Sequence, residues 1–301
     1  MQCLHAPSIS EQFSHVANLH PCFSGDANMN RARIHLPVSP LCNIQCRFCK
    51  RSFNKNERRP GVTAELLKPE AAVEVVSRAL EMYPEITVVG IAGPGDTLAT
   101  THALETFALI HEKFPSLINC LSTNGLLLER NAEAVQKAGV QTLTVTVNAV
   151  DPVILDKICS RVFLDGVNYQ GVEGAALLIE AQKRGIKKAA GLGMLIKINI
   201  VLIPSVNGSH IAEIARTVKE AGAGIINIIP LIPQHEFEGF PEPDCFVLDE
   251  ERRAAEQFLP VFRHCQHCRA DAIGIPGKGD RTIADLLPPG YSGIEQTFSH
   301  G

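Results

Sequence analysis

A regular alternation of strand-like and helix-like runs constrains the fold of this chain more than any other feature. Apolar runs rich in β-branched residues predict strands at 31–39, 86–92, 117–122, 141–147, 194–202 and 225–229. Amphipathic runs predict helices at 69–82, 101–114, 129–138, 170–184, 208–221 and 249–264. Repeated βα units predict an α/β fold with a parallel sheet, and 301 residues are enough for one such domain.

Several of these strands alternate polar and apolar side chains, although a parallel sheet covered by helices normally reads as continuously apolar. Arg33 and His35 share one face of the first run, and Lys197 and Asn199 share one face of the fifth. In the fourth run, threonines alternate with apolar residues up to Asn148. We therefore predict a partial (β/α)6 barrel of the TIM type, whose polar, partly basic lumen holds a large anionic reactant. The alternative is an antiparallel α+β sheet with one face in water.

Three cysteines follow the first strand in the stretch CNIQCRFC at 42–49. Cys42, Cys46 and Cys49 have the spacing C-x3-C-x2-C, which can hold three irons of a four-iron cluster. A cluster used only for electron transfer normally takes four cysteines, so an open iron suits the binding and cleavage of a small molecule. With this motif the chain resembles the radical S-adenosylmethionine (SAM) superfamily. A zinc knuckle is the alternative, but zinc sites prefer two separated C-x2-C pairs.

Active sites of barrels form at the carboxyl ends of the strands. The second strand is followed there by Gly93, Pro94, Gly95 and Asp96. Because glycine lets backbone approach a ligand closely, we predict that Gly93, Gly95 and Asp96 bind the methionyl end of SAM. The alternative is an ordinary turn.

Polar residues also end the third, fourth and fifth strands. Ser122 and Asn124 share parity with Cys120, so all three are predicted to face the lumen. We expect Ser122, Asn124, Asn148 and Asn199 to hydrogen-bond the carboxylate or ribose of SAM. For Asn124 the alternative is an Asn-Gly turn that closes the strand.

A second metal-type spacing follows the last predicted helix. Cys265 and Cys268 form a C-x2-C pair in a tail that we expect to fold over the barrel mouth. Two ligands do not complete a site, and His20, Cys22 and Cys120 are available to complete it. A redox-active pair is the competing interpretation.

The charged loop at 56–62 is a further candidate. If it folds over the cluster, Arg59 can stack on adenine and Glu57 can handle a proton. The alternative is a solvent-exposed surface loop.

Composition excludes several classes of function. The net charge of −4 gives no basic field for nucleic acid. No apolar run reaches membrane-spanning length, and the first twenty residues lack the pattern of a signal peptide, so we expect a cytoplasmic protein. In a reducing compartment, ten cysteines favour metal or catalytic use over disulfides. Cys3, Cys159 and Cys245 stand alone and are expected to be small buried hydrophobic residues.

Motifs along nearly the whole chain resemble the NifB family, whose members build the core of the nitrogenase iron–molybdenum cofactor. The matching segments span residues 20–274 and are HPCFS, ARIHLPVSPLCNIQCRFCKR, NERRPGV, GIAGPGDTLA, CLSTNGL, TVTVNAVDP, KINIVLIPSVN and HCQHCRADAIG. CNIQCRFC, RPGV and CRADAIG in this order make the resemblance specific.

The resemblance implies a radical SAM barrel with three iron–sulfur sites. Cys42, Cys46 and Cys49 would carry the SAM-binding 4Fe-4S cluster. Two auxiliary 4Fe-4S clusters would be substrates, fused into an eight-iron, nine-sulfur core that contains a carbide. One SAM would donate the methyl group that becomes the carbide, and another would supply a 5′-deoxyadenosyl radical. The implied auxiliary ligands are His20, Cys22, Cys120, Cys265 and Cys268.

The resemblance also implies roles and partners. Glu57, Arg59 and Cys120 would be the catalytic residues, and Lys197 would help to hold the anionic cofactor and clusters. Partners would be an iron–sulfur cluster donor, an electron donor of the ferredoxin or flavodoxin type, and carrier or scaffold proteins of nitrogenase assembly. We expect a monomer that binds neither nucleic acid nor membrane.

The expected organisation is an N-terminal extension at 1–30 with cluster ligands, a barrel at 31–264, and a ligand-bearing tail at 265–301. No NifX-like domain is expected after it. The chain departs from the family pattern before the first strand, where Asn28 and Asn30 stand in place of histidines. Two other functions stay open: a radical SAM enzyme with auxiliary clusters acting on a peptide or small molecule, and a non-enzymatic cluster scaffold.

Overall fold

The computed structural model describes residues 9–279 and 281–294. Six strands of its main sheet pair in parallel in the order β11-β10-β7-β6-β5-β1. They are β1 (Ala32–His35), β5 (Ile86–Ile91), β6 (Ile118–Thr123), β7 (Val140–Thr146), β10 (Leu195–Leu202) and β11 (Ile225–Pro230). All six were predicted, and only the first ends well before its predicted bound. Pro37 and Pro40 explain this, because proline has no N–H to donate to a sheet.

Helices cover the outer face of this sheet. They are α3 (Pro69–Met82), α4 (His102–Lys113), α5 (Leu128–Lys137), α7 (Gly171–Gly191), α9 (Ile211–Ala221) and α10 (Cys245–Glu256). The predicted helix at 170–184 continues through Gly185, where α7 and α5 are so close that a Cβ would lie 2.9 Å from the Leu128 Cβ. The predicted helix at 249–264 is shifted: α10 ends at Glu256, and Val261 pairs with Ile226 of β11 instead.

The polar face of the sheet lies inside the molecule. Arg33, Thr142 and Lys197 are all buried, at 6%, 0% and 5% exposure. A wet face of an antiparallel sheet would leave such side chains exposed, so burial and parallel pairing together exclude that alternative. Because β1 and β11 do not pair with each other, the sheet is a partial barrel with an open side.

The C-terminal tail crosses this open side. Phe262 N donates to Ile226 O at 2.7 Å, next to β11. The tail then pairs antiparallel with β1 through β12 (Ala272–Gly274), which in turn pairs with β13 (Arg281–Thr282). The tail therefore runs along the open side between the two edge strands rather than over the mouth, because the unpaired edge of β1 accepts it as a further strand.

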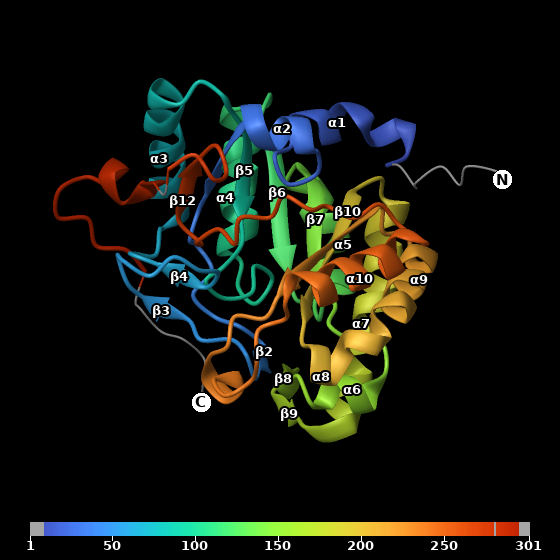
Figure 1. Cartoon of the computed structure of the whole chain (residues 1–301). Coiled ribbons are helices and arrows are strands. Elements are labelled where there is room, and N and C mark those ends of the chain that lie inside the picture. The colour runs from blue at the N-terminus through green and yellow to red at the C-terminus, as the bar shows by residue number, and fades with distance from the viewer. Residues whose placement is uncertain (1–8, 280, 295–301) are drawn as a thin grey trace.

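The N-terminal extension lies at the amino ends of the strands. It contains η1 (Glu11–Phe13), α1 (Ser14–Leu19) and α2 (Gly25–Asn30). Val16 packs on Val88 and Ile118, and the Thr87 hydroxyl donates to Leu19 O at 2.6 Å. Figure 1 shows α1 and α2 at the end opposite to the arrowhead of β6. The extension thus closes the end opposite to the expected mouth, because its apolar residues meet the apolar first residues of the strands.

Short elements surround the carboxyl ends of the strands. β2 (Ile44–Cys46), β8 (Cys159–Leu164) and β9 (Val167–Tyr169) form a small sheet, and β3 (Ser52–Phe53) pairs with β4 (Val62–Thr63). The remaining short helices are α6 (Pro152–Asp156), α8 (Pro204–Asn207), η2 (Gly208–His210), η3 (His235–Phe237) and η4 (Ile283–Leu286). No helix in the described part of the chain combines the length and apolarity that crossing a bilayer needs.

Candidate active site

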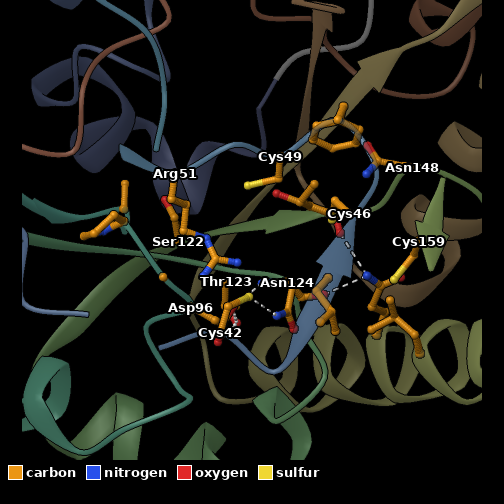
Figure 2. Close-up of a pocket in the computed structure, with 18 of the residues that line it drawn as sticks. Cys42, Cys46, Cys49, Arg51, Asp96, Ser122, Thr123, Asn124, Asn148 and Cys159 are labelled. Carbon is orange, nitrogen blue, oxygen red and sulfur yellow. Dashed lines mark hydrogen bonds between the residues drawn. The ribbon is translucent and has the colours of Figure 1, made fainter. Parts of the chain in front are cut away.

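A cavity of about 190 Å³ lies at the carboxyl ends of β5, β6 and β7. Figure 2 shows the side chains on its wall. The predicted site residues among them are Cys42, Cys46, Cys49, Gly95, Asp96, Ser122, Asn124 and Asn148. The fold therefore brings residues from four separate sequence segments to one place.

The loop after β5 holds the start of the cysteine loop. Gly95 N donates to Ser39 O at 2.8 Å, and Asp96 N donates to Leu41 O at 2.7 Å. A Cβ on Gly95 would lie only 2.0 Å from Leu41 O, so this position requires glycine. The expected close approach is thus real, but what approaches Gly95 is the backbone of the cysteine loop.

The cysteine thiols lie beside a buried cation. Burial raises the pKa of the Cys42 thiol to about 11, and the neighbouring Arg51 guanidinium opposes that rise. Burial favours a lower pKa for Arg51, but the thiols of Cys42 and Cys49 outweigh it and raise that pKa. A fixed positive charge among three thiols suits a bound anionic group.

Asp96 uses its carboxylate to shape the end of β6. The carboxylate accepts hydrogen bonds from the Thr123 hydroxyl at 2.9 Å, Asn124 N at 2.6 Å and Leu98 N at 3.0 Å. Burial raises the pKa of Asp96, although the backbone N–H groups of Asn124 and Leu98 counteract it. Asp96 therefore lines the cavity with a carboxylate whose oxygens already bind protein donors.

The amides on the cavity wall are held in fixed orientations. Asn124 Nδ2 donates to Asn43 Oδ1 at 2.6 Å, and Asn124 Oδ1 accepts from Leu126 N at 2.9 Å. Gly125 follows with a φ of +86°, so the Asn-Gly turn is present and its amide still faces the cavity. Asn148 Oδ1 accepts from Val201 N at 2.9 Å.

Several predicted site residues lie outside this cavity wall. Glu57 and Arg59 pair with each other at 2.5 Å, and Glu57 also accepts from the Ser52 hydroxyl at 3.1 Å. Asn199 Oδ1 accepts from Asn227 Nδ2 at 3.1 Å. Gly93, with a φ of +118°, precedes the cavity-lining Pro94.

A second group of thiols is separate from the cavity wall. Burial raises the pKa of Cys22 to about 12, Lys197 opposes the rise, and Cys268, Cys120 and Cys265 add to it. The four thiols are thus close enough to interact, although their sequence positions span most of the chain. We call them the lumen thiols. Lys197, also outside the cavity wall, donates to Cys22 O at 3.3 Å.

Two histidines accompany the lumen thiols: His20 is buried and His35 is half-buried. Burial lowers the pKa of His20 well below its usual value, and burial together with Arg33 lowers the pKa of His35 to about 4. Both imidazoles are therefore neutral, the form that binds metals. His20 Nδ1 accepts from Cys22 N at 3.1 Å, whereas its buried Nε2 has no hydrogen-bond partner among the described residues.

Arg33 is hydrogen-bonded to one of the lumen thiols. Its Nη2 donates to Cys268 Sγ at 3.0 Å. His35 contacts the backbone of the tail rather than a thiol, with its Nδ1 3.0 Å from Arg269 O. Within the described ranges, no three histidine, cysteine or acidic side chains converge to hold a single metal ion. Ligands of a four-iron cluster each bind a different iron and need not converge in that way.

The cavity wall also contains residues that were not predicted as site residues, among them Arg51, Gln182 and Cys159. Arg51 follows the third cysteine by two positions, a signal that was available in the motif. Gln182 reaches the cavity from α7 and donates to Asn124 O at 2.7 Å, and nothing in a helical pattern marks it. Cys159 was expected to be a small buried residue; it is buried, at 4% exposure, but it lies beside Cys46.

The other two isolated cysteines do not line the cavity. Cys245 was expected to be buried but is exposed, because it begins α10 at the surface, and Cys3 lies outside the described residues.

Comparison with known proteins identifies the family of this chain. The sequence profile of the radical SAM superfamily matches residues 36–218. The FeMo cofactor biosynthesis protein NifB of Methanocaldococcus infernus is 48% identical over 88% of this chain and 88% of its own length. NifB of Klebsiella pneumoniae is 44% identical over 90% of this chain, which spans 60% of that longer protein.

Among solved structures, methylornithine synthase matches with a TM-score of 0.49 and 13% identity, over 91% of this chain and 85% of its own. The sequence matches carry the assignment, because they combine high identity with coverage of most of the chain. The chain belongs to the NifB family of radical SAM enzymes, which use a 4Fe-4S cluster and SAM.

Proposed function

We propose that this protein is a nitrogenase cofactor maturase that fuses two 4Fe-4S clusters into an eight-iron, nine-sulfur core containing a carbide. The names of its relatives, FeMo cofactor biosynthesis protein NifB, support this function. The observation that carries it is that one barrel contains two separate sets of cysteine thiols. One lines the cavity at the carboxyl ends of the strands, and the other is formed by the lumen thiols.

The cavity fits the resident cofactors. Cys42, Cys46 and Cys49 would hold the SAM-binding cluster, with Arg51 balancing its negative charge. When bound, the cluster and SAM supply a methyl group and a 5′-deoxyadenosyl radical. Ser122 and Asn148 would orient SAM, since both line the cavity and Asn148 is fixed by β10. Asp96 and Gly95 would act mainly by holding the cysteine loop and the end of β6.

The lumen fits anionic substrate clusters. His20, Cys22, Cys120, Cys265 and Cys268 would bind two 4Fe-4S clusters, and Nε2 of His20 would become a ligand atom on losing the proton that it carries while Nδ1 accepts from Cys22 N. Lys197 and Arg33 place positive charge beside these ligands. The described parts of the N-terminal extension and of the C-terminal tail border this space, so they would help to shield the substrates from water and oxygen while they react.

Glu57 and Arg59 would take part indirectly. Their mutual ion pair lies on the loop after the cysteines, and Arg59 donates to Lys50 O next to Cys49. We propose that the pair fixes this loop, and that an electron donor of the ferredoxin or flavodoxin type and a cofactor carrier are partners.

Reconstitution tests the proposal. The protein receives SAM, a reductant, iron and sulfide without oxygen, and its product is added to cofactor-free nitrogenase. We expect nitrogenase activity and formation of 5′-deoxyadenosine, both lost in Cys42→Ala. 5′-Deoxyadenosine without activation would support a different radical SAM substrate. Absence of both from the wild-type protein would support a scaffold.

A further inference from the structure

The amide of Asn148 has a fixed orientation on the cavity wall. Its Oδ1 accepts from Val201 N at 2.9 Å, so the oxygen points to the backbone of β10. Because a backbone N–H requires an acceptor opposite it, oxygen and nitrogen of this amide cannot exchange places. The side chain lines the cavity, where Figure 2 shows it. Asn148 therefore offers the cavity the N–H groups of its Nδ2, which are donors.

A second asparagine holds the backbone on both sides of this contact. Asn207 of α8 is completely buried, at 0% exposure, and is not part of the cavity wall. Its Nδ2 donates to Asn148 O and to Val201 O, both at 2.9 Å. Its Oδ1 accepts from Ile203 N at 2.8 Å. One buried amide thus joins the two residues whose mutual hydrogen bond orients the Asn148 side chain.

His210 of η2 holds the same loop two residues further on. Val150 N donates to His210 Nε2 at 3.1 Å. Since Nε2 accepts this bond, the imidazole proton is on Nδ1, which lies 3.1 Å from Glu213 Oε2 and donates to it. The loop after β7 is therefore fixed at both Asn148 and Val150 by side chains that follow β10.

We propose that Asn207 positions Asn148 to donate a hydrogen bond to an oxygen of bound SAM. The oxygens of SAM belong to its carboxylate and ribose, and both kinds accept hydrogen bonds. Asn207 is a positioning residue, because it would act on SAM only through Asn148, and His210 supports the same loop. The inference rests on the proposed contact of Asn148 with SAM.

Equilibrium dialysis with radiolabelled SAM tests this on the full chain, reconstituted without oxygen and matched for iron content. The proteins are wild type, Asn148→Ala, Asn207→Ala and the double variant, with Asn131→Ala as the control. Asn131 also donates from its amide to a backbone carbonyl, Leu127 O at 2.9 Å, but it does not line the cavity.

We expect the dissociation constant of SAM to rise about tenfold in Asn148→Ala and in Asn207→Ala, the effect of one lost hydrogen bond. The control should bind SAM as the wild type does. The double variant should bind SAM no more weakly than Asn148→Ala, because two residues that act through one contact are not additive. A purely structural role of Asn207 would lower stability without this dependence on Asn148.

Two results would overturn the inference. One is wild-type affinity in Asn207→Ala, and the other is an additive loss in the double variant. If Asn207→Ala does not fold, His210→Ala replaces it in the same cycle, and the same two results decide. Wild-type affinity in Asn148→Ala would remove the proposed contact with SAM and the inference with it. The maturase function is tested separately, by activation of nitrogenase with the wild-type product.

Discussion

Close backbone contact sets the requirements of the single residues around the cavity. At Gly95 the nearest atoms to an added Cβ are Leu41 O at 2.0 Å, Leu41 C at 2.5 Å and Ser39 O at 2.8 Å. All three belong to the backbone that leads into the cysteine loop. They cannot rotate away as a flexible side chain could, so a larger residue must displace the loop.

Gly95→Ala should therefore destabilise the protein and disturb the cysteine loop. We expect a loss of about 1–3 kcal/mol in the free energy of unfolding, the usual cost of overpacking. Urea unfolding and the iron content of the purified protein measure the two effects. Gly239→Ala is the matched control, because nothing lies within 4 Å of its Cβ position. Equal stability of the two variants would contradict this account.

At the residue scale, the sequence predicted the cavity better than it predicted individual roles. Spacing and strand ends selected Cys42, Ser122 and Asn148 correctly as neighbours in the cavity. The sequence did not reveal that Gly95 packs against the backbone of the cysteine loop or that Cys159 pairs with Cys46. Both contacts join segments whose separation in space depends on packing.

At the scale of elements, a buried ion pair fixes the C-terminal tail to the loop after the cysteines. Arg269 Nε and Nη2 donate to Asp271 at 2.7 and 2.8 Å, and the two side chains are 6% and 0% exposed. Arg269 also donates to Asn54 O at 2.9 Å, and Asp271 accepts from Ala64 N at 2.8 Å. The pair therefore joins three segments near the edge of β1.

Asp271→Ala should loosen this junction strongly. It leaves the Arg269 guanidinium buried without its carboxylate, which costs about 3–5 kcal/mol in comparable sites. Thermal or urea unfolding measures the loss, and limited proteolysis locates it in the tail. Glu180→Ala removes an exposed ion pair with Lys183 and should leave the unfolding midpoint close to wild type. A similar midpoint for both variants would mean that the tail contributes little.

At the scale of the whole molecule, the lumen brings together thiols from distant parts of the chain. Cys22 comes from the N-terminal extension, Cys120 from β6, and Cys265 and Cys268 from the tail. Distant parts of the chain thus meet in the middle of the barrel. Such a convergence is expected if the lumen holds substrate clusters, because thiols and neutral imidazoles are ligands of iron.

Iron and sulfide content checks this arrangement. Protein prepared without oxygen should contain about twelve irons for three four-iron clusters, and Cys120→Ala and Cys265→Ala should each lose about four. Cys245→Ala, which changes an exposed cysteine, should keep the wild-type content. About four irons in the wild type would restrict the chain to the SAM-binding cluster.

The sequence by itself determined the βα order, the polar lumen face and the three-cysteine loop. These depend on local signals, namely side-chain periodicity and the spacing of cysteines over a few residues. Only the tertiary structure decided that the tail closes the open side between β11 and β1 and that the N-terminal extension covers the amino ends. The same holds for the contact of Cys159 with Cys46. These contacts join residues far apart in sequence, and the unpaired strand edges and apolar surfaces that select them exist only once the barrel has formed.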